Sequence, residues 1–90
     1  MAAQFLISDY IRAAMALATY KHLDDGSVAG RIPPCPGVIT FAETEDRCQI
    51  ELQSVLEEWV WLGLKHGHPI PVIGGINLSE EPAVATLDSL

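Results

Sequence analysis

Basic side chains are scarce in this sequence of 90 residues. Five Lys and Arg stand against twelve Asp and Glu, so the formal net charge at pH 7 is −7. Proteins that bind nucleic acids neutralise phosphates with clusters of Lys and Arg, so we do not expect direct binding to nucleic acid. The acidic balance suits a basic protein partner better, because opposite charges speed association.

Cysteine and histidine are also few, with two and three residues. Cys35 and Cys48 do not make a disulfide framework or a zinc quartet, and we expect both to be reduced and packed as small apolar side chains. His66 and His68 lie close in the chain, but metal sites need three or four ligands, and no further ligand stands at a recognisable spacing. We therefore expect no metal and no cofactor.

Long apolar runs and catalytic motifs are missing as well. No stretch reaches the about 18 consecutive apolar residues of a membrane-spanning helix, and the first 20 residues lack the basic start of a signal peptide. There is no glycine-rich phosphate loop and no nucleophile elbow. These absences predict a cytoplasmic binding module rather than an enzyme. Hydrophobic residues still make up 49% of the chain, which favours oligomerisation in so small a domain.

The most strongly marked element is a helix over residues 44–67. Thr44 is a good N-cap residue, and acidic residues follow it where the helix dipole is positive. At the other end, Gly67 suits the left-handed C-terminal position, and Pro69 prevents continuation. One face of this helix is apolar at three- and four-residue spacing and is expected to cover a sheet; its residues are Cys48, Leu52, Val55, Leu56, Trp59, Leu62 and Gly63.

The opposite side of the same helix carries a second pattern. At about 100° per residue, Ile50, Trp61 and Leu64 point away from the core face, with Glu57 between them. An exposed tryptophan with flanking aliphatic residues predicts contact with a partner, either another copy or another protein. The alternative is that the N-terminal segment folds back over this side within one chain.

The rest of the chain predicts one α+β domain over residues 1–78. An amphipathic helix is expected at about residues 4–16, followed by strands over residues 17–23 and 27–32 that are joined by a turn at Asp24, Asp25 and Gly26. Three prolines within residues 33–37 end this hairpin. A third strand over residues 38–42 leads to the long helix, and a short final strand interrupted at Gly74 and Gly75 is expected within residues 72–78. Residues 79–90 look like a loose acidic tail.

This order of elements and turn residues resembles the HicB-like antitoxin family of type II toxin-antitoxin systems. The likeness covers about residues 17–78. The residues that carry it are Asp25 and Gly26 in the hairpin turn, Pro33, Pro36 and Gly37 in the following loop, Thr44 and Trp59 in the helix, and Leu64, Gly67, Pro69, Ile70 and Pro71 in the closing motif. The sequence departs from the family pattern at Pro34, where the family has Asp, and at Cys35, where it has another apolar residue.

The resemblance implies a partial RNase H-like arrangement in which one long helix covers a three-stranded antiparallel sheet. It also implies an antitoxin-like domain that binds and masks a small basic RNA-cleaving toxin of the HicA type and assembles as a homo-oligomer, a dimer or a tetramer. Many such antitoxins add a DNA-binding segment, but residues 79–90 are short and contain no Lys or Arg, so none is expected here. The alternative is a stand-alone oligomeric structural or regulatory protein with no toxin partner.

Overall fold

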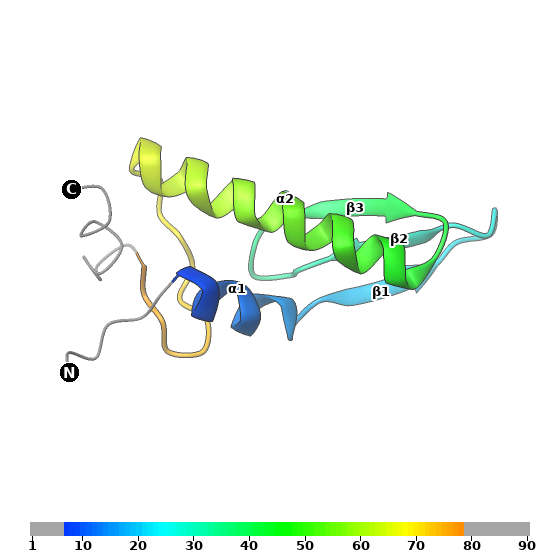
Figure 1. The fold of residues 1–90 in the computed structure, drawn as a ribbon, viewed down its shortest axis with the longest axis horizontal. Helices are drawn as coiled ribbons and strands as arrows, with labels where there is room; N and C mark the ends of the chain where they lie inside the picture. The colour runs from blue at the N-terminus through cyan, green and yellow to red at the C-terminus, as the bar shows by residue number, and fades with distance from the viewer. Residues whose placement is uncertain (1–6, 79–90) are drawn as a thin grey trace.

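The computed structural model describes residues 7–78, so the predicted acidic tail and the first residues of the predicted N-terminal helix lie outside the described residues. The fold is α+β, as predicted (Figure 1). Two helices and three strands follow one another along the chain. They are α1 (Ile7–Met15), β1 (Thr19–His22), β2 (Val28–Arg31), β3 (Ile39–Ala42) and α2 (Glu45–His66).

Both ends of α2 form as their residues predict. The Thr44 hydroxyl accepts a hydrogen bond from the Arg47 backbone N–H at 3.1 Å, which satisfies one of the free amides of the first turn. At the other end Gly67 has a φ of 73°, and the His68 N–H donates to the Gly63 carbonyl at 2.8 Å. Local sequence is therefore enough to fix the length of this helix.

The three strands form one antiparallel sheet in the order β1-β2-β3. The hairpin between β1 and β2 turns at Gly26, which has a φ of 92°. The Asp25 carboxylate accepts hydrogen bonds from the Ser27 hydroxyl at 2.6 Å and the Ser27 N–H at 2.9 Å. These bonds lower the pKa of Asp25 below its usual value, because they stabilise the charged carboxylate.

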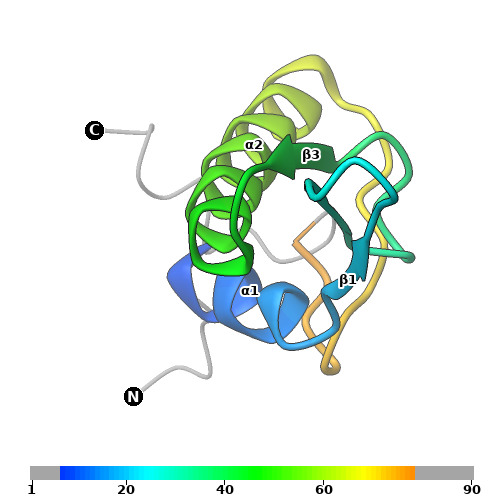
Figure 2. The same cartoon turned by 90° about the vertical axis from the view of Figure 1, so that its right-hand side faces the viewer.

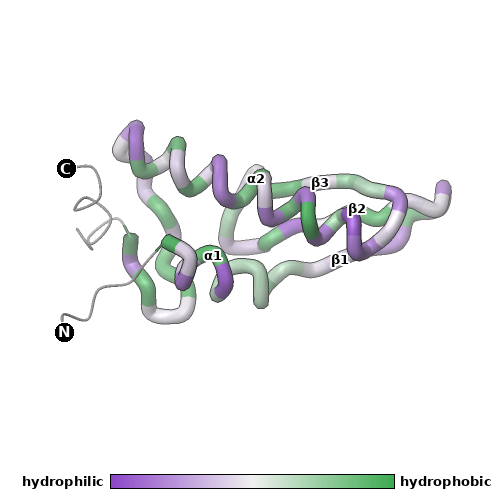
Figure 3. Tube along the Cα trace, viewed as in Figure 1, coloured by the Kyte–Doolittle hydropathy of each residue, from purple (hydrophilic) through white to green (hydrophobic). Residues whose placement is uncertain are grey.

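One face of the sheet packs against α2. Gly30 in β2 lets the helix approach closely, since a Cβ atom there would lie 2.8 Å from the Cys48 sulfur. The Cys48 sulfur is also 3.4 Å from the Thr40 hydroxyl of β3. Figure 3 shows how hydrophobic positions recur along α2 and in β3. The largest fully buried side chains are Tyr10, Ile32, Leu52, Leu56, Val28, Val38, Val60, Cys35 and Cys48.

The second half of α2 extends past the strands and is covered by α1 and the segment that follows α2 (Figures 1 and 2). This cover corrects the predicted core face. Val60, which was not expected in the core, is fully buried. Val60 shares its buried cluster with Tyr10 and Ile11 of α1. Leu62 was expected in the core but is 41% exposed, and it lines a surface hollow that no residue of α1 borders. Leu64 is half-buried against the core rather than outward-facing.

The segment after α2 differs from the short final strand that the sequence predicts. Gly74 and Gly75 both have positive φ, at 60° and 77°, and turn the chain back on itself. Ile73 and Ile76 then face each other in an isolated antiparallel bridge instead of joining the sheet. Neither helix of the described part of the chain is long and apolar enough to cross a membrane.

Candidate protein-interaction surface

The outer side of α2 carries exposed apolar side chains, as the sequence predicts. Ile50 is 64% exposed and Trp61 is 56% exposed, and Glu57 between them is also exposed. Eleven residues of helix separate Ile50 from Trp61, which is a rise of about 16 Å. The two side chains therefore share a side of α2 without forming one contiguous patch. Leu64, the fourth residue predicted on this surface, packs against the core instead.

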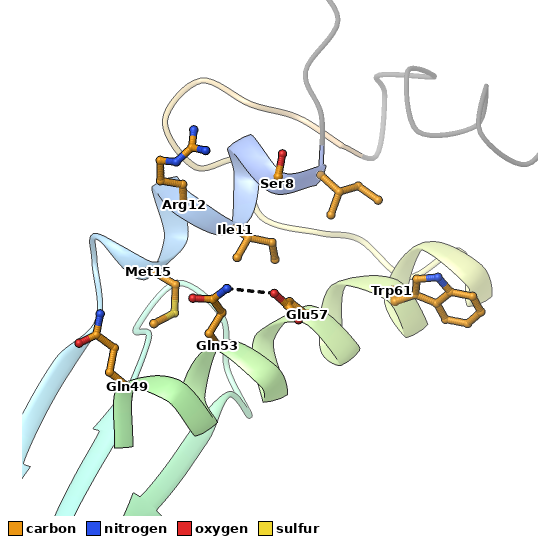
Figure 4. Close-up of a pocket in the computed structure, with 9 residues that line it drawn as sticks. Ser8, Ile11, Arg12, Met15, Gln49, Gln53, Glu57 and Trp61 are labelled. Atoms are coloured by element: carbon orange, nitrogen blue, oxygen red, sulfur yellow. Dashed lines mark hydrogen bonds between the residues drawn. The ribbon is translucent and has the colours of Figure 1, made fainter. Parts of the chain in front are cut away.

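A groove of about 630 Å³ lies between α1 and α2 and extends to Trp61. Figure 4 shows Ile11 and Met15 of α1 directed toward α2, while the polar side chains of α2 line the other wall. The α1 wall is mostly apolar and the α2 wall is mostly polar. The groove is lined by Ile7, Ser8, Ile11, Arg12, Met15, Gln49, Gln53, Glu57 and Trp61.

Trp61 stands between this groove and a second, shallower hollow on its other side. The second hollow is lined by Ser54, Glu57, Glu58, Trp61 and Leu62. The Lys65 ammonium lies 4.9 Å from the centre of the Trp61 ring, a cation–π contact that holds the exposed ring in place. A large, partly held aromatic side chain beside two hollows is the kind of residue that anchors protein interfaces.

The charges around Trp61 are unevenly paired. Arg12 is 3.3 Å from Asp9, and Arg47 is 3.3 Å from Glu51, so these arginines are engaged within their own helices. Glu57 accepts a hydrogen bond from the Gln53 amide at 3.0 Å, which leaves its charge uncompensated. Within residues 7–78, no basic side chain forms an ion pair with Glu57 or Glu58. The surface beside Trp61 therefore carries two carboxylates without an ion-pair partner, next to the Lys65 ammonium over the ring.

The residues that carry the family resemblance lie elsewhere and shape the fold. Gly37 has a φ of 96°, and a Cβ atom there would lie 3.9 Å from the Trp59 indole nitrogen. Trp59 is half-buried against the core, so it does not share the exposed surface of Trp61. Of the remaining motif residues, Asp25 and Gly26 form the hairpin turn, Pro33 and Pro36 lie in the β2–β3 loop, Thr44 and Gly67 cap α2, and Pro69 and Pro71 lie in the segment after α2.

The described residues hold no group of three His, Cys, Asp or Glu side chains that could bind a metal ion. The His66 and His68 rings are close, with centroids 5.7 Å apart, but they are on their own. Cys35 and Cys48 are free and buried. Burial raises the pKa of the Cys35 thiol, which makes it less reactive than an exposed cysteine.

Sequence reasoning missed two features of the surface. The α1 side of the groove depends on where α1 docks, and no local pattern states this. The second feature is a pair of exposed residues in β3, Ile39 and Phe41, which alternate with the buried Val38 and Thr40. The period-two alternation was visible in the sequence and was the available signal.

Comparisons with known proteins agree with this fold. The family model described as UPF0150-like matches residues 9–71, which is more than half of the chain. Among solved structures, the chain is similar to TTHA0281 from Thermus thermophilus, with 32% sequence identity and a TM-score of 0.75 over 80% of this chain and 90% of that chain. No curated protein matches the sequence at a significant level. The chain belongs to the UPF0150-like family.

Proposed function

We propose that this protein is a HicB-like antitoxin domain that binds and masks a small basic RNA-cleaving toxin of the HicA type in the cytoplasm. Its role is binding rather than catalysis. The observation that carries the proposal is the surface at Trp61, where an exposed aromatic ring borders two hollows and the uncompensated carboxylates of Glu57 and Glu58.

The proposed surface has the parts that a tight interface needs. Trp61 supplies a large apolar anchor, and the groove beside it offers Ile11 and Met15 to an apolar side chain of the partner. The two glutamates favour a partner that presents Lys or Arg next to that side chain. A net charge of −7 attracts a basic protein over a longer range.

The test is a pull-down with the full chain, co-expressed with any small basic protein encoded beside it. The captured protein is identified by mass spectrometry and assayed for RNA cleavage with and without the chain. We expect a stoichiometric complex in which RNA cleavage is suppressed. We expect Trp61→Glu to raise the dissociation constant at least about tenfold, because an interface anchor is lost and a charge is buried.

Val72→Glu is the matched control, since Val72 is 57% exposed and lies outside both hollows. It introduces the same charge and should leave RNA inhibition unchanged. If no basic RNA-cleaving protein binds, or if Trp61→Glu inhibits as well as the unmodified chain, the proposal fails. A stand-alone regulatory oligomer then becomes the better description.

A further inference from the structure

The sheet has a free edge at β3. The Ile32 N–H donates to the Val38 carbonyl at 3.4 Å, which directs the backbone of Val38 toward β2. Backbone direction alternates along an antiparallel strand, so Thr40 and Ala42 also bond to β2. The N–H and C=O groups of Ile39 and Phe41 therefore point away from the sheet, and no backbone group of residues 7–78 bonds to them.

The same two residues expose their side chains. Thr40 is buried under α2, whereas Ile39 is 48% exposed and Phe41 is 62% exposed on the opposite face of the sheet. All four residues of β3, Ile39–Ala42, are uncharged. A border strand with free backbone groups, apolar side chains and no charge is a template for pairing with another strand.

The charges on this face differ in sign from the carboxylates beside Trp61. Arg31 pairs with Ile39 across β2 and β3, and Lys21 of β1 lies in the same row as Phe41, through Ala29. The strand positions on this face contain two of the five basic residues of the chain and no acidic residue. These two basic side chains do not favour a basic partner at this edge, which better suits an uncharged, apolar strand.

We propose that β3 pairs antiparallel with β3 of a second copy, about a twofold axis at Thr40. In this register Ile39 of each copy lies opposite Phe41 of the other. The free N–H and C=O groups of Ile39 in each copy then face those of Phe41 in the other. Each of these two facing pairs exchanges two backbone hydrogen bonds, so four form across the axis. The result is a continuous six-stranded sheet.

The side chains on the exposed face of the six-stranded sheet also favour this pairing. The two Ile39 and two Phe41 side chains form one apolar cluster across the axis. The Arg31 side chains of the two copies are separated by three strand spacings, or about 14 Å, which is longer than the screening length of about 8 Å at physiological salt. The groove at Trp61 lies between α1 and α2, away from β3, so this interface is separate from the one proposed for a toxin.

The first test is the mass of the full chain in solution, measured by light scattering over a concentration series. We expect a dimer that Phe41→Pro converts to a monomer. Proline removes the outward N–H, which is not used within the chain, so the intrachain ladder is retained. Two of the four intermolecular hydrogen bonds and both Phe41 rings are lost, and we expect the dissociation constant to rise at least about a hundredfold.

Phe41→Lys is the second variant, because it leaves the backbone unchanged and adds a charge at the edge. Circular dichroism checks that each variant is folded. Val72→Lys and Trp61→Glu are controls on other surfaces and should remain dimers. The proposal is wrong if the unmodified chain is a monomer, if the dimer survives both Phe41 variants, or if Trp61→Glu dissociates it.

A crosslinking experiment tests the register. Facing residues of a hydrogen-bonded antiparallel pair have Cα atoms about 5.5 Å apart, which is within disulfide range. We therefore expect Ile39→Cys and Phe41→Cys to form a disulfide-linked dimer when the two variants are mixed and oxidised, and neither to do so alone. Cys35 and Cys48 are buried and should not compete. Efficient crosslinking of Phe41→Cys with itself, or none in the mixture, would overturn this register.

Discussion

The Tyr10 hydroxyl donates a hydrogen bond to the Pro71 carbonyl at a distance of 2.5 Å. This bond joins α1 to the segment that follows α2, which lies 61 residues further along the chain. Tyr10 is fully buried, so its ring and hydroxyl together fix α1 beside the second half of α2. The groove at Trp61 depends on this position, because α1 forms one of its walls.

Tyr10→Phe should therefore destabilise the fold and loosen the groove. It leaves the ring in place but removes the only side-chain donor to the half-buried Pro71 carbonyl in the described chain, and the loss of one hydrogen bond costs about 0.5–1.5 kcal/mol. The free energy of unfolding, measured in urea, should fall by that amount. Tyr20→Phe is the control, since no hydrogen bond of the Tyr20 hydroxyl exists within residues 7–78. Equal stability of the two variants would contradict the role given to Tyr10.

The same tyrosine gives the fold a dependence on alkaline pH. Burial, and next to it the nearby Cys35, raises the pKa of Tyr10 above its usual value of about 10. The folded state then holds this proton more tightly than the unfolded state, so the stabilisation is complete below pH about 10 and is lost as pH rises further. Unfolding free energy should fall more steeply above this pH in the unmodified chain than in Tyr10→Phe. Parallel pH profiles of the two proteins would refute the assignment.

Much of α2 could be predicted because its signals are local. Thr44 and Gly67 act on backbone groups within four residues of themselves, so the sequence states both ends of the helix. Val60 was left out of the predicted core because it is buried together with residues of α1, a segment more than 40 residues away. Leu62 was placed in the core wrongly, since it is exposed. Position along a helix face says which residues are neighbours, but it does not say which flank another element will cover.

The final segment shows a different limit. Ile73 and Ile76 have the β-branched character of strand residues, and they do form a bridge. The two glycines between them adopt positive φ, so the bridge closes a local turn and the segment does not add to the sheet. Strand propensity correctly predicted extended backbone for these residues, but it did not predict which segment they pair with. The groove at Trp61 was unpredictable for the same reason, since it requires the docking of α1.

Close packing of β2 against α2 leads to a prediction at Gly30. A Cβ atom there would lie 2.8 Å from the Cys48 sulfur and 3.1 Å from the Tyr20 ring. Gly30→Ala should lower the free energy of unfolding by about 1–3 kcal/mol, because the helix or the ring must shift. The cost should be smaller in a Cys48→Ala background, where the sulfur is absent. A double-mutant cycle in urea measures this coupling, and simple additivity of the two changes would argue against the contact.

Salt should affect the two proposed interfaces in opposite directions. Toxin binding brings a basic protein to Glu57 and Glu58, and this attraction weakens when salt shortens the screening length from about 10 Å at 0.1 M to about 3 Å at 1 M. Pairing of β3 brings together two copies that each carry a net charge of −7 through strands that contain no charge, so salt reduces repulsion and should strengthen the dimer. The dissociation constants of both complexes are measured across the same salt series.

The double variant Glu57→Gln/Glu58→Gln should flatten the salt dependence of toxin binding and leave the β3 dimer as tight as before. Toxin affinity that rises with salt would contradict a role for Glu57 and Glu58 in toxin binding. A dimer that weakens with salt would contradict pairing through β3, because Ile39–Ala42 contain no charge.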